Sequence, residues 1–175
     1  MRFVDLLKTT VLICAASATL LAGVTVLSAR DAAEEGPLFF AAGWWLLAAI
    51  IGAWLGRRAE TTPPIARLLA AARSTTTLPE QRPGPMLLNR LWPLVVVTVA
   101  ASALAVVAPQ IPAIAAGFAV IWALTWRRQD AAVTAIEERD GVQFYVERTS
   151  PFKPIQLVRL PGFRRIAPPS VNGAG

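Results

Sequence analysis

The acidic residues are the first candidates for chemistry, because paired carboxylates can bind a cation or act as acid and base. Glu137 and Glu138 are adjacent on a segment predicted to be helical, and Asp31, Glu34 and Glu35 lie between two apolar stretches. The second group lacks the glycine-centred pattern of a Ca²⁺-binding loop. We therefore interpret both groups as solvated surface and predict no metal site.

Other residues that commonly carry out catalysis are scarce. The chain has no histidine, and its single cysteine, Cys14, lies inside an apolar stretch, where a small buried hydrophobe is the expected role. Ser17 and Ser102 also lie in apolar stretches, without a histidine, lysine or acidic partner there. Such serines usually bond to their own helix. We predict a protein that is not an enzyme, with no catalytic residues and no cofactor.

Arginines and aromatic residues are stronger candidates for binding. The basic residues flank apolar stretches, so topology and anionic lipid headgroups explain them better than nucleic acid does. The candidate contacts for lipid or for a protein partner are Arg57, Arg58, Arg127, Arg128, Phe144, Tyr145, Phe152, Arg164 and Arg165.

Four apolar stretches without charges predict an all-α membrane protein with a four-transmembrane-helix bundle. Within a transmembrane region of residues 1–126, they cover about residues 9–28, 38–56, 91–108 and 111–126. A helix of about 20 apolar residues is long enough to cross the roughly 30 Å hydrocarbon core. Only 16% of the 175 residues are charged, against about 25% in soluble domains, which supports this class.

Two of these stretches leave alternatives open. The first follows Arg2 and Lys8 and resembles a signal peptide, but its apolar core is long, so we expect an uncleaved helix. The fourth is short and follows the third after a proline-bracketed break at residues 109–112. We expect an antiparallel helical hairpin, with a re-entrant hairpin as the alternative. Pro93 is expected in the first turn of the third helix, which tolerates it.

Positive charge predicts the orientation. Sixteen of the seventeen basic residues flank the predicted spans on one side, and only Arg30 lies on the other. The positive-inside rule places the sixteen in the cytoplasm. We predict a multi-pass protein of the cell (inner or plasma) membrane with both termini cytoplasmic. Many Ala, Pro and Val residues, and more Arg than Lys, are typical of high-GC genomes and favour a bacterial source.

The predicted cytoplasmic loop, residues 57–90, contains a candidate helix. Ile65, Leu68, Leu69 and Ala72 share one face of it. Two positions for this helix fit the pattern equally: on the membrane surface, as a basic amphipathic helix, or packed on the C-terminal tail.

The tail, residues 127–165, is predicted to form a small cytoplasmic helix that continues the fourth span and stops at Gly141, followed by a β-hairpin. Alternating apolar residues predict its two strands, about residues 142–147 and 155–160. An isolated two-stranded hairpin is marginal in water, so we expect support from the loop, the membrane, a second copy or another protein. Residues 166–175 have a disordered composition.

Small residues recur every four positions in three predicted spans and would let helices approach closely. These repeats are Ala15, Thr19 and Gly23; Ala49 and Ala53; Gly52 and Gly56; and Ala113 and Gly117. Packing within the bundle is the expected use, and self-association is the alternative.

Together these features favour a non-catalytic integral membrane protein, a scaffold or accessory subunit presenting a basic cytoplasmic surface. A small oligomeric transporter or channel is the alternative, and its pore would need hydroxyl residues such as Thr25, Thr98 and Thr125. A membrane-interface enzyme with arginines as phosphate clamps fits less well, because no base or nucleophile can be named. The predicted partners are a lipid bilayer with anionic headgroups, and another protein or a second copy bound through the tail.

Overall fold

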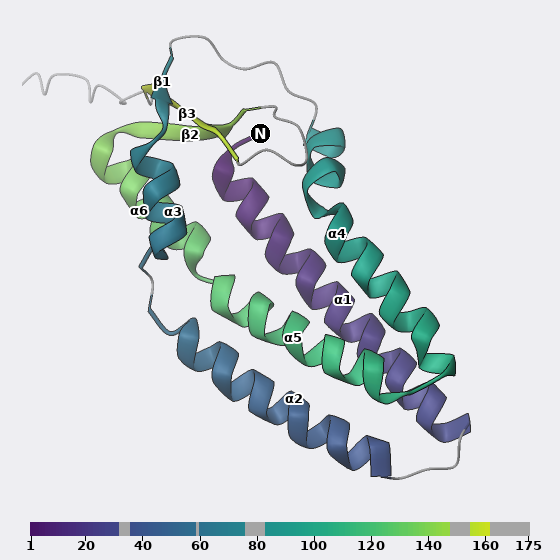
Figure 1. Cartoon of the computed structure of the whole chain (residues 1–175). Helices are drawn as coiled ribbons and strands as arrows, with labels where there is room; N and C mark the ends of the chain where they lie inside the picture. Colours follow the sequence, from purple (N-terminus) through teal and green to yellow (C-terminus); the bar gives the residue numbers. More distant parts are fainter. Residues whose placement is uncertain (32–35, 59, 76–82, 148–154, 162–175) are drawn as a thin grey trace, which may run out of the picture.

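Four long helices and a group of shorter elements make up the chain (Figure 1). The computed structural model describes residues 1–31, 36–58, 60–75, 83–147 and 155–161. The long elements are α1 (Phe3–Asp31), α2 (Gly36–Leu55), α4 (Pro83–Ala103) and α5 (Gln110–Trp126), with the 3-10 helix η1 (Leu104–Val106) before α5. The short ones are α3 (Pro63–Ala70), α6 (Gln129–Asp140), β1 (Arg73–Ser74), β2 (Val142–Val146) and β3 (Leu157–Pro161). The described residues are therefore mostly helical (77%) with a small sheet.

Three helices, α1, α2 and α4, are long and apolar enough to cross a membrane, with 28, 20 and 23 residues in the qualifying segments. This agrees with the predicted membrane class. Helix α5 has 17 residues, which at 1.5 Å per residue is about 26 Å, somewhat less than a hydrocarbon core. By length and composition, the fourth predicted span is therefore not confirmed.

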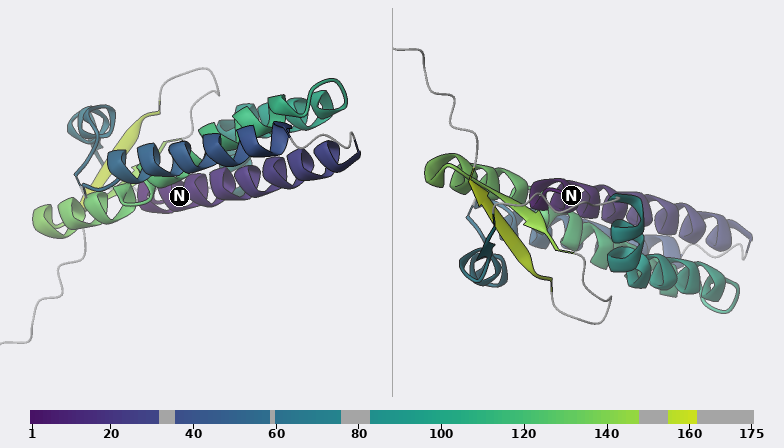
Figure 2. Two further views of the ribbon diagram at one scale, coloured as in Figure 1. Left: turned by 90° about the horizontal axis from the view of Figure 1, so that it is seen from below. Right: turned by 90° about the horizontal axis from the view of Figure 1, so that it is seen from above.

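All four long helices have one end at the same side of the molecule (Figures 1 and 2). The N-termini of α1 and α4 and the C-termini of α2 and α5 lie there. Helices α3 and α6 and the sheet cover this side, and we call them, with the first turns of α1, the cap. The other ends of the four helices, and η1, lie at the opposite side.

Helix α5 lies at the centre, packed against α1 and α2. Its buried residues are small apart from one proline: Pro112, Ala113, Ala116, Gly117, Ala119 and Ala123. Small residues allow close helix–helix approach without large side chains between the backbones.

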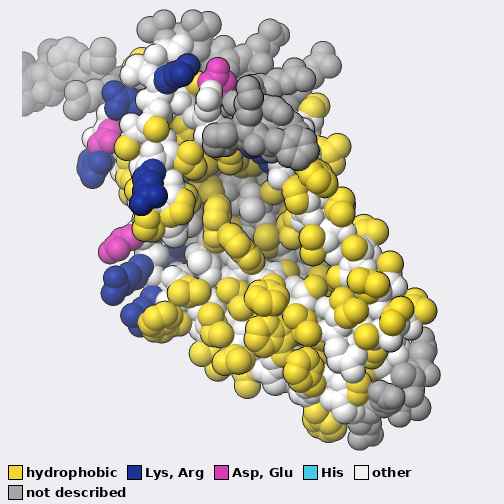
Figure 3. Space-filling view, in the orientation of Figure 1, with side chains coloured by type: hydrophobic (Ala, Val, Ile, Leu, Met, Phe, Trp, Pro, Cys, Tyr) yellow, Lys and Arg dark blue, Asp and Glu magenta, His cyan; other side chains and the backbone are white. Residues whose placement is uncertain are grey.

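Large apolar side chains cover the outside of the bundle (Figure 3). Phe39, Leu46 and Ile50 on α2, and Val97 and Val99 on α4, are more than half exposed. Soluble proteins rarely expose an apolar surface of this extent. We call this surface the apolar belt, and its chemistry suits contact with lipid chains.

Two glycines of the α2 segment determine how closely it approaches α5. A Cβ atom at Gly52 would lie 2.9 Å from the Cβ atom of Leu124. One at Gly56 would overlap the backbone carbonyl oxygen of Leu124. The predicted Gly52–Gly56 repeat is therefore used for packing within the chain.

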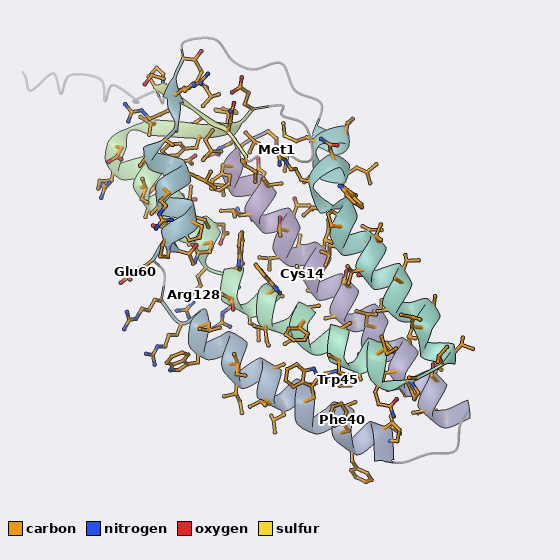
Figure 4. The ribbon with its side chains drawn as sticks, in the orientation of Figure 1. Met1, Cys14, Phe40, Trp45, Glu60 and Arg128 are labelled. Atoms are coloured by element: carbon orange, nitrogen blue, oxygen red, sulfur yellow. The ribbon has the colours of Figure 1, made fainter. Side chains whose placement is uncertain are left out.

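Tryptophans make the second contact between α2 and α5. The Trp45 Nε1–H donates to the carbonyl oxygen of Ala113 at 2.9 Å, and Trp44 Nε1–H donates to that of Ile114 at 3.2 Å. The Trp44 indole occupies the space that a side chain at Gly117 would need. The Ala113–Gly117 repeat is thus also used within the chain, and the two indoles pack internally, as Figure 4 shows for Trp45.

The remaining small-residue repeats contribute less to the interior. Ala15, Thr19 and Gly23 on α1 are exposed, whereas Ala49 and Ala53 on α2 are partly buried. Close packing therefore involves only part of the predicted pattern.

Helix α4 corrects two predictions. It begins at Pro83, inside the segment predicted as a loop, so Pro93 lies within the helix and not in its first turn. An internal proline costs one helical hydrogen bond, which membrane helices tolerate. The extra turns at the start of α4 are stabilised by tertiary packing, because Met86 lies among the buried residues of the cap.

The cap contains a three-stranded sheet in the order β1-β3-β2. Strands β2 and β3 are antiparallel, with Phe144 opposite Arg159, so the two predicted strands do pair. Strand β1 joins β3 in parallel, with Ser74 opposite Arg159. The loop segment before α4 thus supports the paired strands, as one of the four expected supports.

The hydrophobic core of the cap joins distant parts of the sequence. Its buried members, which we call the cap core, are Phe3, Val4, Leu6, Leu7, Ile65, Met86, Val133, Phe144, Val146 and Leu157. Leu68, Leu69 and Ala72 pack against this core beside Ile65. The apolar face of α3 therefore faces the tail, which favours the second of its two predicted positions.

Helix α6 does not continue α5, contrary to prediction. The chain leaves the helical conformation at Arg128, where φ is −110° and ψ is 0°. The buried side chain of Gln129 then accepts from the Thr62 N–H (3.2 Å) and donates to the Glu60 carbonyl (3.1 Å). These bonds attach the start of α6 to the segment before α3. As predicted, α6 stops at Gly141, which adopts φ 64°.

The variant Gly56→Ala should lower the free energy of unfolding by about 1–3 kcal/mol, because the new methyl group would overlap a backbone atom that cannot rotate away. Gly43→Ala is the matched control on α2, since nothing lies within 4 Å of its new Cβ atom. Thermal unfolding in one detergent measures both variants. Equal midpoints would contradict the close approach of α2 to α5.

Candidate functional site

Four arginines lie where α2 and α5 end, and we call them the basic edge: Arg57, Arg58, Arg127 and Arg128. Because Gly56 packs against the backbone of α5, the two helix ends are adjacent. All four side chains are exposed. All four were predicted candidates, and the fold brings the two pairs together from positions about 70 residues apart.

Direct contacts orient two of these arginines. The Arg128 Nη1–H donates to the carbonyl oxygen of Arg57 at 2.6 Å. This carbonyl lies just beyond the end of α2, where backbone oxygens lack helical partners. The Arg57 guanidinium in turn lies over the Trp54 ring, 5.1 Å from its centroid, which is a cation–π distance.

No carboxylate among the described residues forms an ion pair with the basic edge. The described residues contain two ion pairs, Arg2–Glu137 and Arg139–Asp140. Neither pair includes an arginine of the basic edge. Glu60 points away from the bundle, whereas Arg128 lies beside the end of α2 (Figure 4). Basic side chains also gather along one side of the cap and reach the border of the apolar belt (Figure 3). The basic edge thus has open donors at the boundary between charged and apolar surface.

A partly buried ion pair joins the N-terminus to the tail. The Arg2 Nη2–H donates to Glu137 Oε2 at 2.6 Å, and the other oxygen of Glu137 accepts from the Phe144 N–H at 2.9 Å. We call these three groups the cap junction. The Glu137 side chain is 4% exposed and that of Arg2 is 41% exposed. The hydrogen bond to Glu137 raises the pKa of Arg2 above its ordinary value.

The prediction of a solvated Glu137 was therefore wrong, whereas Glu138 is exposed as predicted. Burial of a carboxylate is tolerated because both of its oxygens are hydrogen-bonded and its charge is paired. Arg2 and Glu137 are 135 positions apart, and no periodic pattern in the sequence links them.

Backbone contacts extend the cap junction. The Met1 carbonyl accepts from the Val146 N–H at 3.1 Å, and Arg2 forms an antiparallel bridge with Tyr145. Burial lowers the pKa of the Met1 amino group from its ordinary 8.0. The first two residues thus extend the free side of β2.

The predicted aromatic contacts have different positions. Phe144 is 2% exposed inside the cap core, so it anchors the tail within the chain and is no surface for lipid or partner. Tyr145 is partly buried, and its hydroxyl donates to Gln143 Oε1 at 2.9 Å. The predicted contacts Phe152, Arg164 and Arg165 lie outside the described residues, as do the acidic Glu34 and Glu35.

Hydroxyl groups in the long helices bond mostly to their own backbone. Those of Thr25, Thr98 and Ser102 each donate, at 2.8 Å, to the carbonyl oxygen four residues earlier. A hydroxyl bonded in this way contributes less to a polar pathway. The buried Thr125 Oγ1 has no hydrogen-bond partner among the described residues.

Within the part of the chain that the structure describes, no group of three His, Cys, Asp or Glu side chains could hold a metal ion. No protein-family model, curated protein or solved structure matches the chain. The basic edge and the cap are the candidate functional surfaces.

The variant Glu137→Ala should lower the stability of the cap by about 1.5–3 kcal/mol, because the buried Phe144 N–H and Arg2 both lose their acceptor. Hydrogen–deuterium exchange at the β2 amides should become faster. Glu138→Ala, at the exposed neighbouring position, should change stability by no more than about 0.5 kcal/mol. Identical exchange in the two variants would show that the cap junction does not stabilise the cap.

Proposed function

We propose that the chain is a four-span protein of a bacterial cell membrane, and that it serves as a non-catalytic scaffold or accessory subunit. Its cap and both termini would lie in the cytoplasm. One observation carries this proposal: the cap core and the cap junction join the cap to the long helices.

The arrangement of α5 supports four spans. Helices α4 and α5 are antiparallel, and α5 lies between α1 and α2 along most of its length (Figure 1). The neighbours α1 and α2 are both candidate spans, and α5 also exposes large apolar side chains, namely Ile114, Phe118 and Trp122. The basic residues on the cap side support a cytoplasmic cap by the positive-inside rule.

The composition of the cap supports a scaffold. Since the first turns of α1 and α4 supply part of the cap core, a protein bound to the cap would be held at a fixed position relative to the membrane. Arg67, Arg73 and Arg159 are exposed on α3, β1 and β3, and we call them the cap arginines. An acidic protein surface would complement them.

An oligomeric transporter or channel is the second candidate. The exposed α1 repeat could support assembly, but Thr25, Thr98 and Ser102 use their hydroxyls within their own helices. A polar pathway would then depend on few groups, so we place this candidate second.

Cysteine labelling tests the topology in a Cys14→Ala background, because Cys14 is the single cysteine. A membrane-impermeant maleimide should label Gly36→Cys and Val107→Cys from outside intact cells or right-side-out vesicles. Glu138→Cys, on the cap, should react only after permeabilisation. All three positions are exposed, and Val107 is 80% exposed beyond η1.

Each labelling outcome has a separate meaning. A Val107→Cys variant that reacts only from the cap side would contradict the crossing of α4 and α5 and favour a re-entrant hairpin. External labelling of Glu138→Cys would reverse the proposed orientation.

Crosslinking in native membranes, with quantitative mass spectrometry, tests the scaffold role. We expect a protein partner whose recovery falls roughly tenfold when the three cap arginines are replaced by glutamate, because like charges would then face each other. Replacement by lysine keeps the charge and should preserve recovery. If every crosslinked protein were recovered equally from all forms, the cap arginines would not be the docking surface.

A further inference from the structure

We propose that the basic edge binds one anionic phospholipid through its phosphate group, with Arg57 and Arg128 as the two clamping residues. This inference rests on the proposed membrane crossing but not on the scaffold role. It assigns a specific ligand to a surface separate from the cap arginines.

The orientation of the two guanidinium groups is the first argument. Arg128 uses Nη1 to bond the Arg57 carbonyl, and its other side-chain N–H groups have no hydrogen-bond partner among the described residues. Arg57 is placed by Trp54, whose ring centroid lies 5.1 Å from the Arg57 Cζ atom, and its side chain is exposed. A guanidinium presents planar pairs of donors that match two oxygens of a phosphate. The chain therefore holds two phosphate-binding groups in defined positions before a ligand arrives.

The surface next to the basic edge is the second argument. Ile50, Trp54 and Leu55 on α2, and Trp122 on α5, are 58%, 60%, 47% and 55% exposed. They belong to the turns that lead up to the arginines. Tryptophan favours the headgroup level of a bilayer, with apolar side chains deeper. A ligand that fits both parts has an anionic head and acyl chains, which free phosphate lacks.

The uncompensated charge is the third argument. Four cations follow two adjacent helix ends, and among the described residues none of them forms an ion pair. Such a cluster repels itself and attracts an anion. An acidic protein would offer charge, but it would have to displace the lipids that cover Trp54. The phospholipid therefore satisfies the charge and the apolar surface together.

Native mass spectrometry of the purified full chain tests this proposal. The protein is titrated with phosphatidylglycerol and, separately, with phosphatidylcholine of identical acyl chains. The wild type should bind the anionic lipid more tightly. In the double variant Arg57→Gln, Arg128→Gln its affinity should fall roughly 25-fold, about fivefold for each arginine near the membrane surface.

A matched control removes the same charge elsewhere. The double variant Arg73→Gln, Arg159→Gln changes two exposed arginines of the sheet and should bind phosphatidylglycerol within about twofold of the wild type. Should loss of the Arg128 hydrogen bond disturb the fold, Arg58→Gln, Arg127→Gln serves as a second test. The side chains of these two arginines form no hydrogen bond with a described residue, and their loss should still weaken binding at least fivefold.

Three results would overturn the proposal: equal affinity for the two lipids, equal losses in the basic-edge and sheet variants, or displacement of the bound lipid by soluble glycerol phosphate. The last result would identify a soluble phosphate compound as the ligand. Cysteine labelling of the same variants separates the outcomes, because correct topology with no lipid preference would reject this inference alone.

Discussion

The carboxylate of Glu137 is the contact on which the arrangement of the cap depends. A buried carboxylate is tolerated only when its charge and its lone pairs are satisfied. One oxygen of Glu137 accepts from Arg2, at the start of the chain, and the other accepts from the backbone of β2. A single residue of α6 thus places the N-terminus and strand β2. Since Arg2 precedes α1 directly, the sheet is held at the end of that helix and is no separate tail.

The packing of the bundle depends on a different constraint: the helices approach closely only where no large side chain lies between them. Gly56 and Gly117 leave room for the α5 backbone and for the Trp44 indole, so α2 can lie directly on α5. Contact at this distance also brings the C-terminal ends of the two helices together. The basic edge is a consequence of this packing, because its arginines follow those ends. Packing inside the bundle and charge at its surface are therefore linked.

Much of the local structure could be predicted from composition and periodicity. Apolar runs located the long helices, the repeat of Ile65, Leu68, Leu69 and Ala72 identified the buried face of α3, and alternation located β2 and β3. The sequence-based predictions were wrong where a contact between residues far apart in the chain determines the local structure. Pro93 lies inside α4 because the cap packs against the turns before it, and the chain bends at Arg128 where Gln129 bonds the segment before α3. The four arginines of the basic edge could be predicted individually from the sequence, but not that they form one surface.

Sequence by itself determined the class of protein, the approximate limits of its long helices and the side on which positive charge collects. These properties depend on the transfer of nearby residues between water and an apolar phase, which a short window of sequence records. Only the tertiary structure decided that Glu137 is buried against Arg2, that Phe144 faces inward, and that Arg57 meets Arg128. Those outcomes depend on which segments far apart in the chain come into contact, and hydropathy and periodicity carry no information about that pairing.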